Sequence, residues 1–156
     1  MDLKIQFTPN VSANIQYHYA NFINNNKVKQ NSGLDIPCPN NHTILPKSYG
    51  TKVHLGIKVS AYNNDCRQPF MLALRSSTGL KTPIRLSNHI EIIDVGYNDE
   101  ICAIVDNYSD ELYTIKTGDR LFQIITPSLQ PIYSISTVKQ QPNTIRNDEG
   151  LGSTEI

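Results

Sequence analysis

The sequence contains no tryptophan, only three cysteines and no excess of charge of either sign. Fourteen basic and fourteen acidic side chains cancel, so overall charge does not favour binding to nucleic acid or to an anionic membrane. No apolar run approaches the roughly 20 residues of a membrane helix, and polar residues rather than an apolar signal segment follow Met1. We therefore expect an intracellular protein, cytoplasmic with the nucleus as the alternative, whose partners are neither nucleic acid nor membrane.

The three cysteines lie far apart at Cys38, Cys66 and Cys102 and form no Cys-x-x-Cys pair. No two of the four histidines have the spacing of metal ligands either. Neither a disulfide scaffold nor a structural zinc site is expected. The cysteines are interpreted as small buried apolar side chains.

Three common catalytic motifs are also missing. The chain has no Gly-x-x-x-x-Gly-Lys-Ser/Thr phosphate loop, no Gly-x-Ser-x-Gly elbow and no His-Glu-x-x-His motif. The common ATPase and GTPase mechanisms are thereby disfavoured, and serine-hydrolase and zincin chemistry has no support.

Short apolar segments with the two-residue period of β-strands are what the chain does contain. The clearest is 51–60, where Val53, Leu55, Ile57 and Val59 alternate with polar residues. Similar runs occur at 3–7, 70–74, 101–105, 112–115, 121–125 and 132–135, separated by turn-forming residues. The pattern predicts an all-β sandwich, jelly roll or barrel with at most one short helix, just after Ser77.

The length of 156 residues corresponds to one domain. Its 38% apolar content predicts a modest core that would gain from assembly. Apolar alternation stops after residue 138, so we divide the chain into a β domain at 1–138 and a flexible C-terminal tail at 139–156.

Three polar clusters suit a phosphorylated ligand. Arg75-Ser76-Ser77 follows an apolar strand and offers a guanidinium and two hydroxyls, although, taken alone, a turn with a salt bridge is the better explanation. Asp94 stands between an apolar strand and a turn, where a carboxylate can act as a general base or can simply cap the turn. The tail combines Arg146 with Gly-Leu-Gly-Ser-Thr at 150–154, which suits phosphate binding or disorder.

The order of these clusters resembles the trimeric dUTPase family along most of the chain. Five motifs occur in sequence, and the fourth is the closest match. They are Ser32-Gly33-Leu34-Asp35-Ile36, Leu74-Arg75-Ser76-Ser77, Asn88 through Tyr97 with its Ile-Asp core, Gly118-Asp119-Arg120-Leu121-Phe122-Gln123-Ile124, and Arg146 through Thr154.

The resemblance implies a distorted jelly-roll subunit, a homotrimer with shared active sites, and hydrolysis of dUTP to dUMP and pyrophosphate. Asp94 would activate the water that attacks the α-phosphate, and Asp35 would position Mg²⁺ through water. The third motif would form a hairpin that reads uracil and packs on deoxyribose. The implied substrate-binding residues are Arg75, Ser76, Ser77 and Gln123 for phosphates, Asn88, Ile92, Ile93 and Tyr97 for the nucleoside, and Arg146, Leu151, Gly152, Ser153 and Thr154 in a closing tail.

The chain departs from the family pattern at several positions. Glu91 stands in place of a glycine before the Ile-Asp core, and Asn98-Asp99 replaces Arg-Gly, where Asn and Asp are the residues next best able to accept positive φ. In the tail, Leu151 replaces an aromatic that stacks on uracil. Since such stacking contributes roughly 1–3 kcal/mol, the sequence predicts a looser lid and a higher KM.

Two alternatives remain. One is a dUTPase-like module that binds nucleotide without turnover, suggested by Glu91 and by the tail residues Asn147, Glu149 and Leu151. The other is a dCTP deaminase-type enzyme, which shares the Arg-Ser-Ser pattern but needs a catalytic glutamate near position 104. Because this chain has Ile104 there and carries the Gly-Ser-Thr tail, deamination is the weaker alternative.

Overall fold

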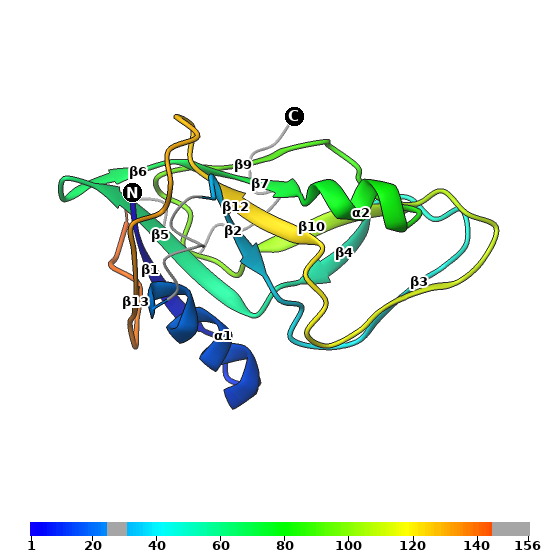
Figure 1. Cartoon of the computed structure of the whole chain (residues 1–156), viewed down its shortest axis with the longest axis horizontal. Coiled ribbons are helices and arrows are strands. Elements are labelled where there is room, and N and C mark those ends of the chain that lie inside the picture. The colour runs from blue at the N-terminus through cyan, green and yellow to red at the C-terminus, as the bar shows by residue number, and fades with distance from the viewer. Residues whose placement is uncertain (25–30, 145–156) are drawn as a thin grey trace.

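The computed structural model describes residues 1–24 and 31–144, and strands dominate it (Figure 1). This confirms the all-β prediction.

The strands form four sheets in the described part of the chain. One sheet has the order β13 (Ser134–Thr137), β1 (Asp2–Phe7), β5 (Ile57–Asn63), β6 (Cys66–Gln68). A second contains β4 (Thr51–His54), β10 (Cys102–Asn107) and β8 (Ile84–Leu86). A third pairs β11 (Tyr113–Ile115) with β3 (His42–Ile44), and a fourth has the order β2 (Gly33–Ile36), β12 (Phe122–Ile125), β7 (Phe70–Leu74), β9 (Glu91–Ile93).

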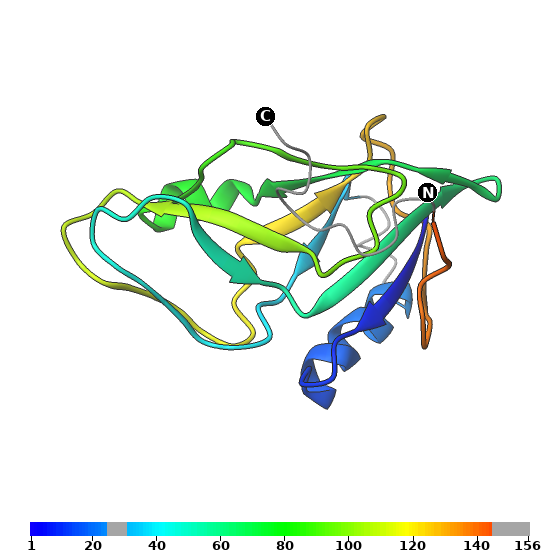
Figure 2. The ribbon, with the colours of Figure 1, turned by 180° about the vertical axis from the view of Figure 1, so that it is seen from behind.

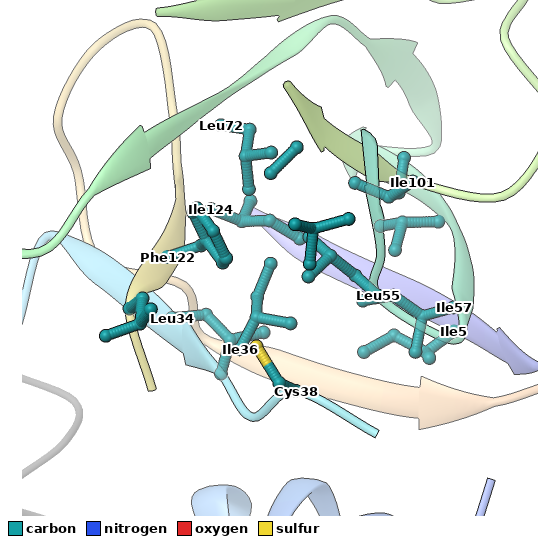
Figure 3. Packing of buried hydrophobic residues seen from close by; sticks show 14 of the residues in the cluster. Ile5, Leu34, Ile36, Cys38, Leu55, Ile57, Leu72, Ile101, Phe122 and Ile124 are labelled. Carbon is teal, nitrogen blue, oxygen red and sulfur yellow. The ribbon is translucent and has the colours of Figure 1, made fainter. Parts of the chain in front are cut away.

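The inward faces of these sheets enclose one apolar core. Branched aliphatic side chains from β2, β5, β7 and β12 meet there, with Phe122 among them and Cys38 at one side (Figure 3). Leu34, Ile57, Leu72 and Ile124 are fully buried, and each has another buried apolar residue two positions away in its own strand. The core therefore holds the strands that carry the polar clusters in a fixed register.

The segment 51–60 does not form the single strand that its alternation predicts. It divides into β4 and β5, which belong to different sheets, and Gly56 turns the chain between them with a φ of 71°. A side chain at Gly56 would collide with Val11 and Pro39. Alternation survives the turn because Leu55 and Ile57 both remain buried, so the sequence pattern does not reveal the change of sheet.

The described part of the chain contains two helices where at most one was expected. The expected one is α2 (Ser76–Lys81), and the additional one is α1 (Ala13–Asn24). Figure 2 shows α1 outside the main body of strands, beside β1. Its buried side chains Ile15, Tyr19 and Phe22 have helical spacing, but three apolar positions make a weak stripe among polar residues. Neither helix is long and apolar enough to span a membrane.

The described cysteines form no disulfide. Cys38 and Cys102 are buried as expected, whereas the expectation is wrong for Cys66, which is exposed. Cys66 begins β6, the edge strand of its sheet, directly after a turn in which Asn64 and Asp65 both have positive φ. An edge position next to a turn leaves the thiol no neighbouring layer to pack against.

The first residues of the expected tail are anchored to the β domain. Gln141 is buried, and its amide group accepts from Ser60 Oγ at 2.7 Å and donates to the carbonyls of Lys4 and Lys58 at 3.0 Å. Thr144 Oγ1 donates to the carbonyl of Gly96 at 2.7 Å. At Thr144 the chain therefore lies beside the third motif.

Candidate active site

A polar groove lies on one face of the sheet formed by β2, β12, β7 and β9, where Asp35, Gln123 and Ile125 alternate with buried residues. Gln123 of β12 lies between Asp35 of β2 and Ala73 of β7 in the ladder. Arg75 follows two positions after Ala73, at the point where β7 ends. Antiparallel pairing therefore brings the first, second and fourth motifs together.

Asp35 and two arginines form an ion-pair network at the groove. Arg75 Nε lies 2.7 Å from Asp35 Oδ1, and Arg120 Nη1 lies 3.4 Å from Asp35 Oδ2. Arg75 Nη1 also donates to the carbonyl of Arg120 at 2.8 Å. The guanidinium of Arg75 is thus held in position without a bound ligand.

The start of α2 fixes the backbone of the second motif. The Arg75 N–H and the buried hydroxyl of Thr78 both donate to the carbonyl of Leu121, at 2.9 and 2.7 Å. Ser76 and Ser77 occupy the first turn of α2, where Ser76 is exposed. These bonds tie the second motif to the fourth.

Gln123 closes the centre of the groove. Its Nε2 donates to the carbonyl of Leu74 at 3.0 Å, and its Oε1 lies so close to Gly33 that a methyl group there would collide with it. The groove has a volume of about 1000 Å³ including open solvent, and it is lined by Asn31, Ser32, Gly33, Asp35, Arg75, Ser76, Gln123, Ile125 and Leu129. Arginine, hydroxyl and amide donors in this arrangement suit a chain of phosphates.

A second cavity lies between α1 and β2 and shares Asp35 with the groove. His18, Asn21, Phe22 and Arg120 contribute to its lining. Burial lowers the pKa of His18, and the backbone of Asp35 acts in the opposite direction. His18 Nε2 is buried and has no hydrogen-bond partner in the structure. Sequence reasoning missed His18, since it lies before the five motifs.

The third motif does not form the expected hairpin. Its one strand, β9, pairs with β7, whereas β8, which precedes the motif, pairs with β10, so the strands before and within the motif belong to different sheets. Asp94 follows β9 directly and is exposed, and its carbonyl accepts from the N–H of Tyr97 at 3.1 Å. Asp94 therefore sits on a turn beyond the edge of the sheet.

Three of the expected nucleoside-binding side chains differ sharply in exposure. Ile92 is 68% exposed, whereas Ile93 and Tyr97 are buried in the core. The Tyr97 hydroxyl donates to the carbonyl of Glu100 at 2.9 Å, and burial raises its pKa above the ordinary value. Tyr97 therefore remains a neutral phenol that braces the turn.

The departures from the family pattern have definite local roles. Glu91 turns toward Asn88 and accepts a hydrogen bond from its side-chain nitrogen. The positive φ of this segment, 64°, falls on His89 rather than on Asn98 or Asp99. Asn98 instead accepts from Arg67 Nη2 at 2.6 Å and donates to the carbonyl of Pro142 at 2.8 Å.

The structure does not bring all of the predicted site residues together. Asp35, Arg75, Ser76 and Gln123 line one groove, but that lining contains no residue of the third motif. The tail positions lie outside the described residues: Arg146, Leu151, Gly152, Ser153 and Thr154. Arg120 was not assigned a role from the sequence, although its place in the fourth motif was the signal for it.

Comparisons with known proteins agree with this geometry. The dUTPase family model matches residues 20–155. The deoxyuridine 5'-triphosphate nucleotidohydrolase of Ehrlichia canis (strain Jake) is 32% identical over 130 residues, covering 82% of this chain and 83% of its own. The one of Finegoldia magna is 34% identical over 125 residues, covering 79% and 84%.

A solved structure supports the same assignment. The crystal structure of dUTPase from Streptococcus mutans matches with a TM-score of 0.52 and 25% identity, covering 65% of this chain and 78% of that one. This confirms the expected dUTPase-type fold. The chain therefore belongs to the dUTPase family.

Proposed function

We propose that this protein hydrolyses dUTP to dUMP and pyrophosphate. The observation that carries the proposal is the groove in which Asp35, Arg75 and Gln123 converge from three separate motifs. In a chain without net charge, phosphate must be gripped by such a local cluster. The relatives named deoxyuridine 5'-triphosphate nucleotidohydrolases point to dUTP as the triphosphate.

The phosphate chain would lie along the groove. Arg75 supplies a guanidinium already oriented by Asp35 and by the carbonyl of Arg120. Ser76 and Ser77 supply hydroxyls, and Gln123 supplies an amide whose position is fixed by Leu74. Binding through prepositioned donors avoids the cost of ordering them when the nucleotide arrives.

Asp35 would hold Mg²⁺ through water. A hard cation prefers oxygen ligands and keeps several of its waters, and Asp35 offers a carboxylate on the wall of the groove. Asp35 belongs to no group of three metal-ligating side chains in the described part of the chain. Phosphate oxygens and water would therefore complete the coordination, and bound Mg²⁺ would neutralise charge on the triphosphate.

Asp94 would act as the general base. It takes a proton from a water molecule whose oxygen forms a bond to the α-phosphorus, while the bond from that phosphorus to the bridging oxygen of the β-phosphate breaks. Pyrophosphate leaves with the bonding electrons, and dUMP retains the new oxygen. The exposed position of Asp94 on a turn gives it access to a ligand outside its own sheet.

The nucleoside would bind around the third motif. Ile92 presents an exposed apolar side chain, and Asn88 presents a polar one. Ile93 and Tyr97 would support this surface from beneath, with Tyr97 against the deoxyribose. Glu91 contacts Asn88, so it borders the proposed uracil site and is expected to weaken uracil binding rather than abolish it.

The active protein would be a homotrimer with shared sites. The groove of one chain contains Asp35, Arg75 and Gln123 but no residue of the third motif. A neighbouring subunit that docks its Asp94 turn over the groove completes the catalytic set. The tail, with Arg146, Leu151, Gly152, Ser153 and Thr154, would then close over the bound nucleotide and exclude bulk water.

The variant Asp94→Asn tests this mechanism. With Mg²⁺ and dUTP, we expect pyrophosphate release to fall about 10²- to 10⁴-fold, as is typical when a general base is lost, while titration calorimetry still detects dUTP binding. Asp110→Asn serves as the matched control, because Asp110 lies in an exposed pair with Lys47. Its activity should equal that of the wild type.

Other outcomes separate the alternatives. Ammonia released from dCTP by the wild type would contradict the proposal in favour of a deaminase. Binding of dUTP by the wild type without any pyrophosphate would instead indicate a non-catalytic module.

A further inference from the structure

A second cluster of reactive side chains lies where β4 meets the beginning of β10. His54 and Cys102 are directly opposite each other in the antiparallel ladder of these strands. Glu100 lies just before β10, two positions ahead of Cys102, and its side chain contacts that of His54. Imidazole, thiol and carboxylate thus come together, although His54 is distant in sequence from the other two.

The ligand atoms of these three side chains all lie within 4.8 Å of one another. His54 Nδ1 is 3.4 Å from Cys102 Sγ and 2.9 Å from Glu100 Oε2. A tetrahedral zinc with bonds of about 2.0 Å to nitrogen and about 2.3 Å to sulfur separates those two atoms by about 3.5 Å. The observed nitrogen–sulfur separation therefore matches one edge of a zinc tetrahedron.

The cluster is oriented by groups outside it. The N–H of Gly56 donates to Glu100 Oε1 at 2.7 Å, which turns the other carboxylate oxygen toward His54. Cys102 is 5% exposed, while His54 is open to solvent. Metal sites require ligands that are held in position and a path by which the ion enters. Here the buried sulfur and the hydrogen-bonded carboxylate are held in position, and the accessible imidazole lies on the entry path.

We propose that His54, Glu100 and Cys102 form a binding site for Zn²⁺, with water at the fourth position. Nitrogen, sulfur and a single oxygen are the ligands of a borderline-soft cation, whereas Mg²⁺ requires oxygen. This site is therefore chemically different from the one proposed at Asp35. The spacing of ligand residues in the sequence does not reveal this site, because the pairing of β4 with β10 brings its residues together.

Metal binding at this site displaces protons. Burial, with Glu100 adding to it, raises the pKa of Cys102 to about 11, so the thiol is protonated at neutral pH. Formation of the zinc–sulfur bond releases that proton to solvent. The metal would bind His54 through Nδ1, so the neutral imidazole would carry its single proton on Nε2.

Cobalt provides the test, because a cobalt–thiolate bond absorbs in the near ultraviolet and tetrahedral Co²⁺ absorbs strongly in the visible. Co²⁺ is added to the full-length protein with excess Mg²⁺ present. We expect one thiolate-bound Co²⁺ per chain, displaced by Zn²⁺. His54→Gln should weaken Co²⁺ binding by more than about 10-fold, and Cys102→Ser should abolish the near-ultraviolet band.

Matched controls use side chains of the same types elsewhere. Cys66→Ser removes an exposed thiol and His89→Gln an exposed imidazole, and both should leave the spectrum unchanged. The spectrum of Asp94→Asn should also match the wild type, so failure of the proposed hydrolysis would not affect this result. Absence of the thiolate band in the wild type, or its loss in Cys66→Ser, would overturn the proposal.

Discussion

At the scale of single residues, Gly33 controls the position of Gln123. A methyl group at Gly33 would collide with Gln123 Oε1, the far end of a flexible side chain. In Gly33→Ala, Gln123 should move away from the carbonyl of Leu74, and KM for dUTP should rise about 2- to 10-fold through the weakened phosphate contact. Stability should change little, because Ala gains about 0.5–1 kcal/mol over Gly in a strand and so offsets the crowding.

Gly79→Ala is the control for this change. A methyl group at Gly79, within α2, would meet no atom within 4 Å. We expect an unchanged KM and a free energy of unfolding higher by up to about 1 kcal/mol. Steady-state kinetics and urea unfolding measure both quantities. An unchanged KM in Gly33→Ala would show that Gln123 does not contact the substrate.

At the scale of elements, α1 packs on the β domain through Tyr19, whose buried hydroxyl group lowers the stability of the fold. The Tyr19 ring is buried against Phe7, with ring centroids 5.5 Å apart, but its oxygen has no hydrogen-bond partner among the described residues. Because an unsatisfied buried polar group costs about 1–3 kcal/mol, Tyr19→Phe should raise the free energy of unfolding by about 1 kcal/mol. Urea unfolding followed by circular dichroism measures this in a protein without tryptophan.

Tyr97→Phe provides the opposite case. Its hydroxyl donates to the carbonyl of Glu100 at 2.9 Å, so its removal should lower the free energy of unfolding by about 1 kcal/mol. Both variants are compared with the wild type at one protein concentration, since assembly contributes to stability. Equal destabilisation by the two substitutions would mean that the Tyr19 hydroxyl is satisfied in solution.

The elements also show how far the sequence predicts this fold. Alternation predicts most strands because one face of each is buried, and Leu72 and Ile124 follow that rule. It does not predict the break at Gly56, because buried positions continue in phase through a turn that changes sheet. It also misses α1, where Tyr19 belongs to an apolar stripe only three residues long. Local patterns report burial, whereas the assignment of strands to sheets depends on contacts distant in sequence.

At the scale of the whole molecule, the order of the five motifs along the chain predicts more of the candidate site than the spacing of residues within one motif does. Ladder pairing brings Asp35 and Gln123 together across 88 positions. The same fold keeps Asp94 out of the groove that contains Arg75. The cluster of His54 and Cys102 arises only from pairing. A single chain therefore carries both parts of the proposed site without joining them.

Mixing two inactive variants tests whether neighbouring chains join these parts. Asp94→Asn keeps an intact groove, and Arg75→Ala keeps an intact Asp94, so each alone should be inactive. The two variants are unfolded together and refolded in equal amounts, so that trimers form at random. An active site then needs an intact groove on one chain and an intact Asp94 on its neighbour, and each occurs with a probability of one half. About a quarter of wild-type activity should therefore be recovered. Combining the separately folded variants, without subunit exchange, is the control and should give no activity. If refolded mixtures are no more active than their parents, Asp94 and Arg75 must act within one chain, and the shared-site trimer is wrong.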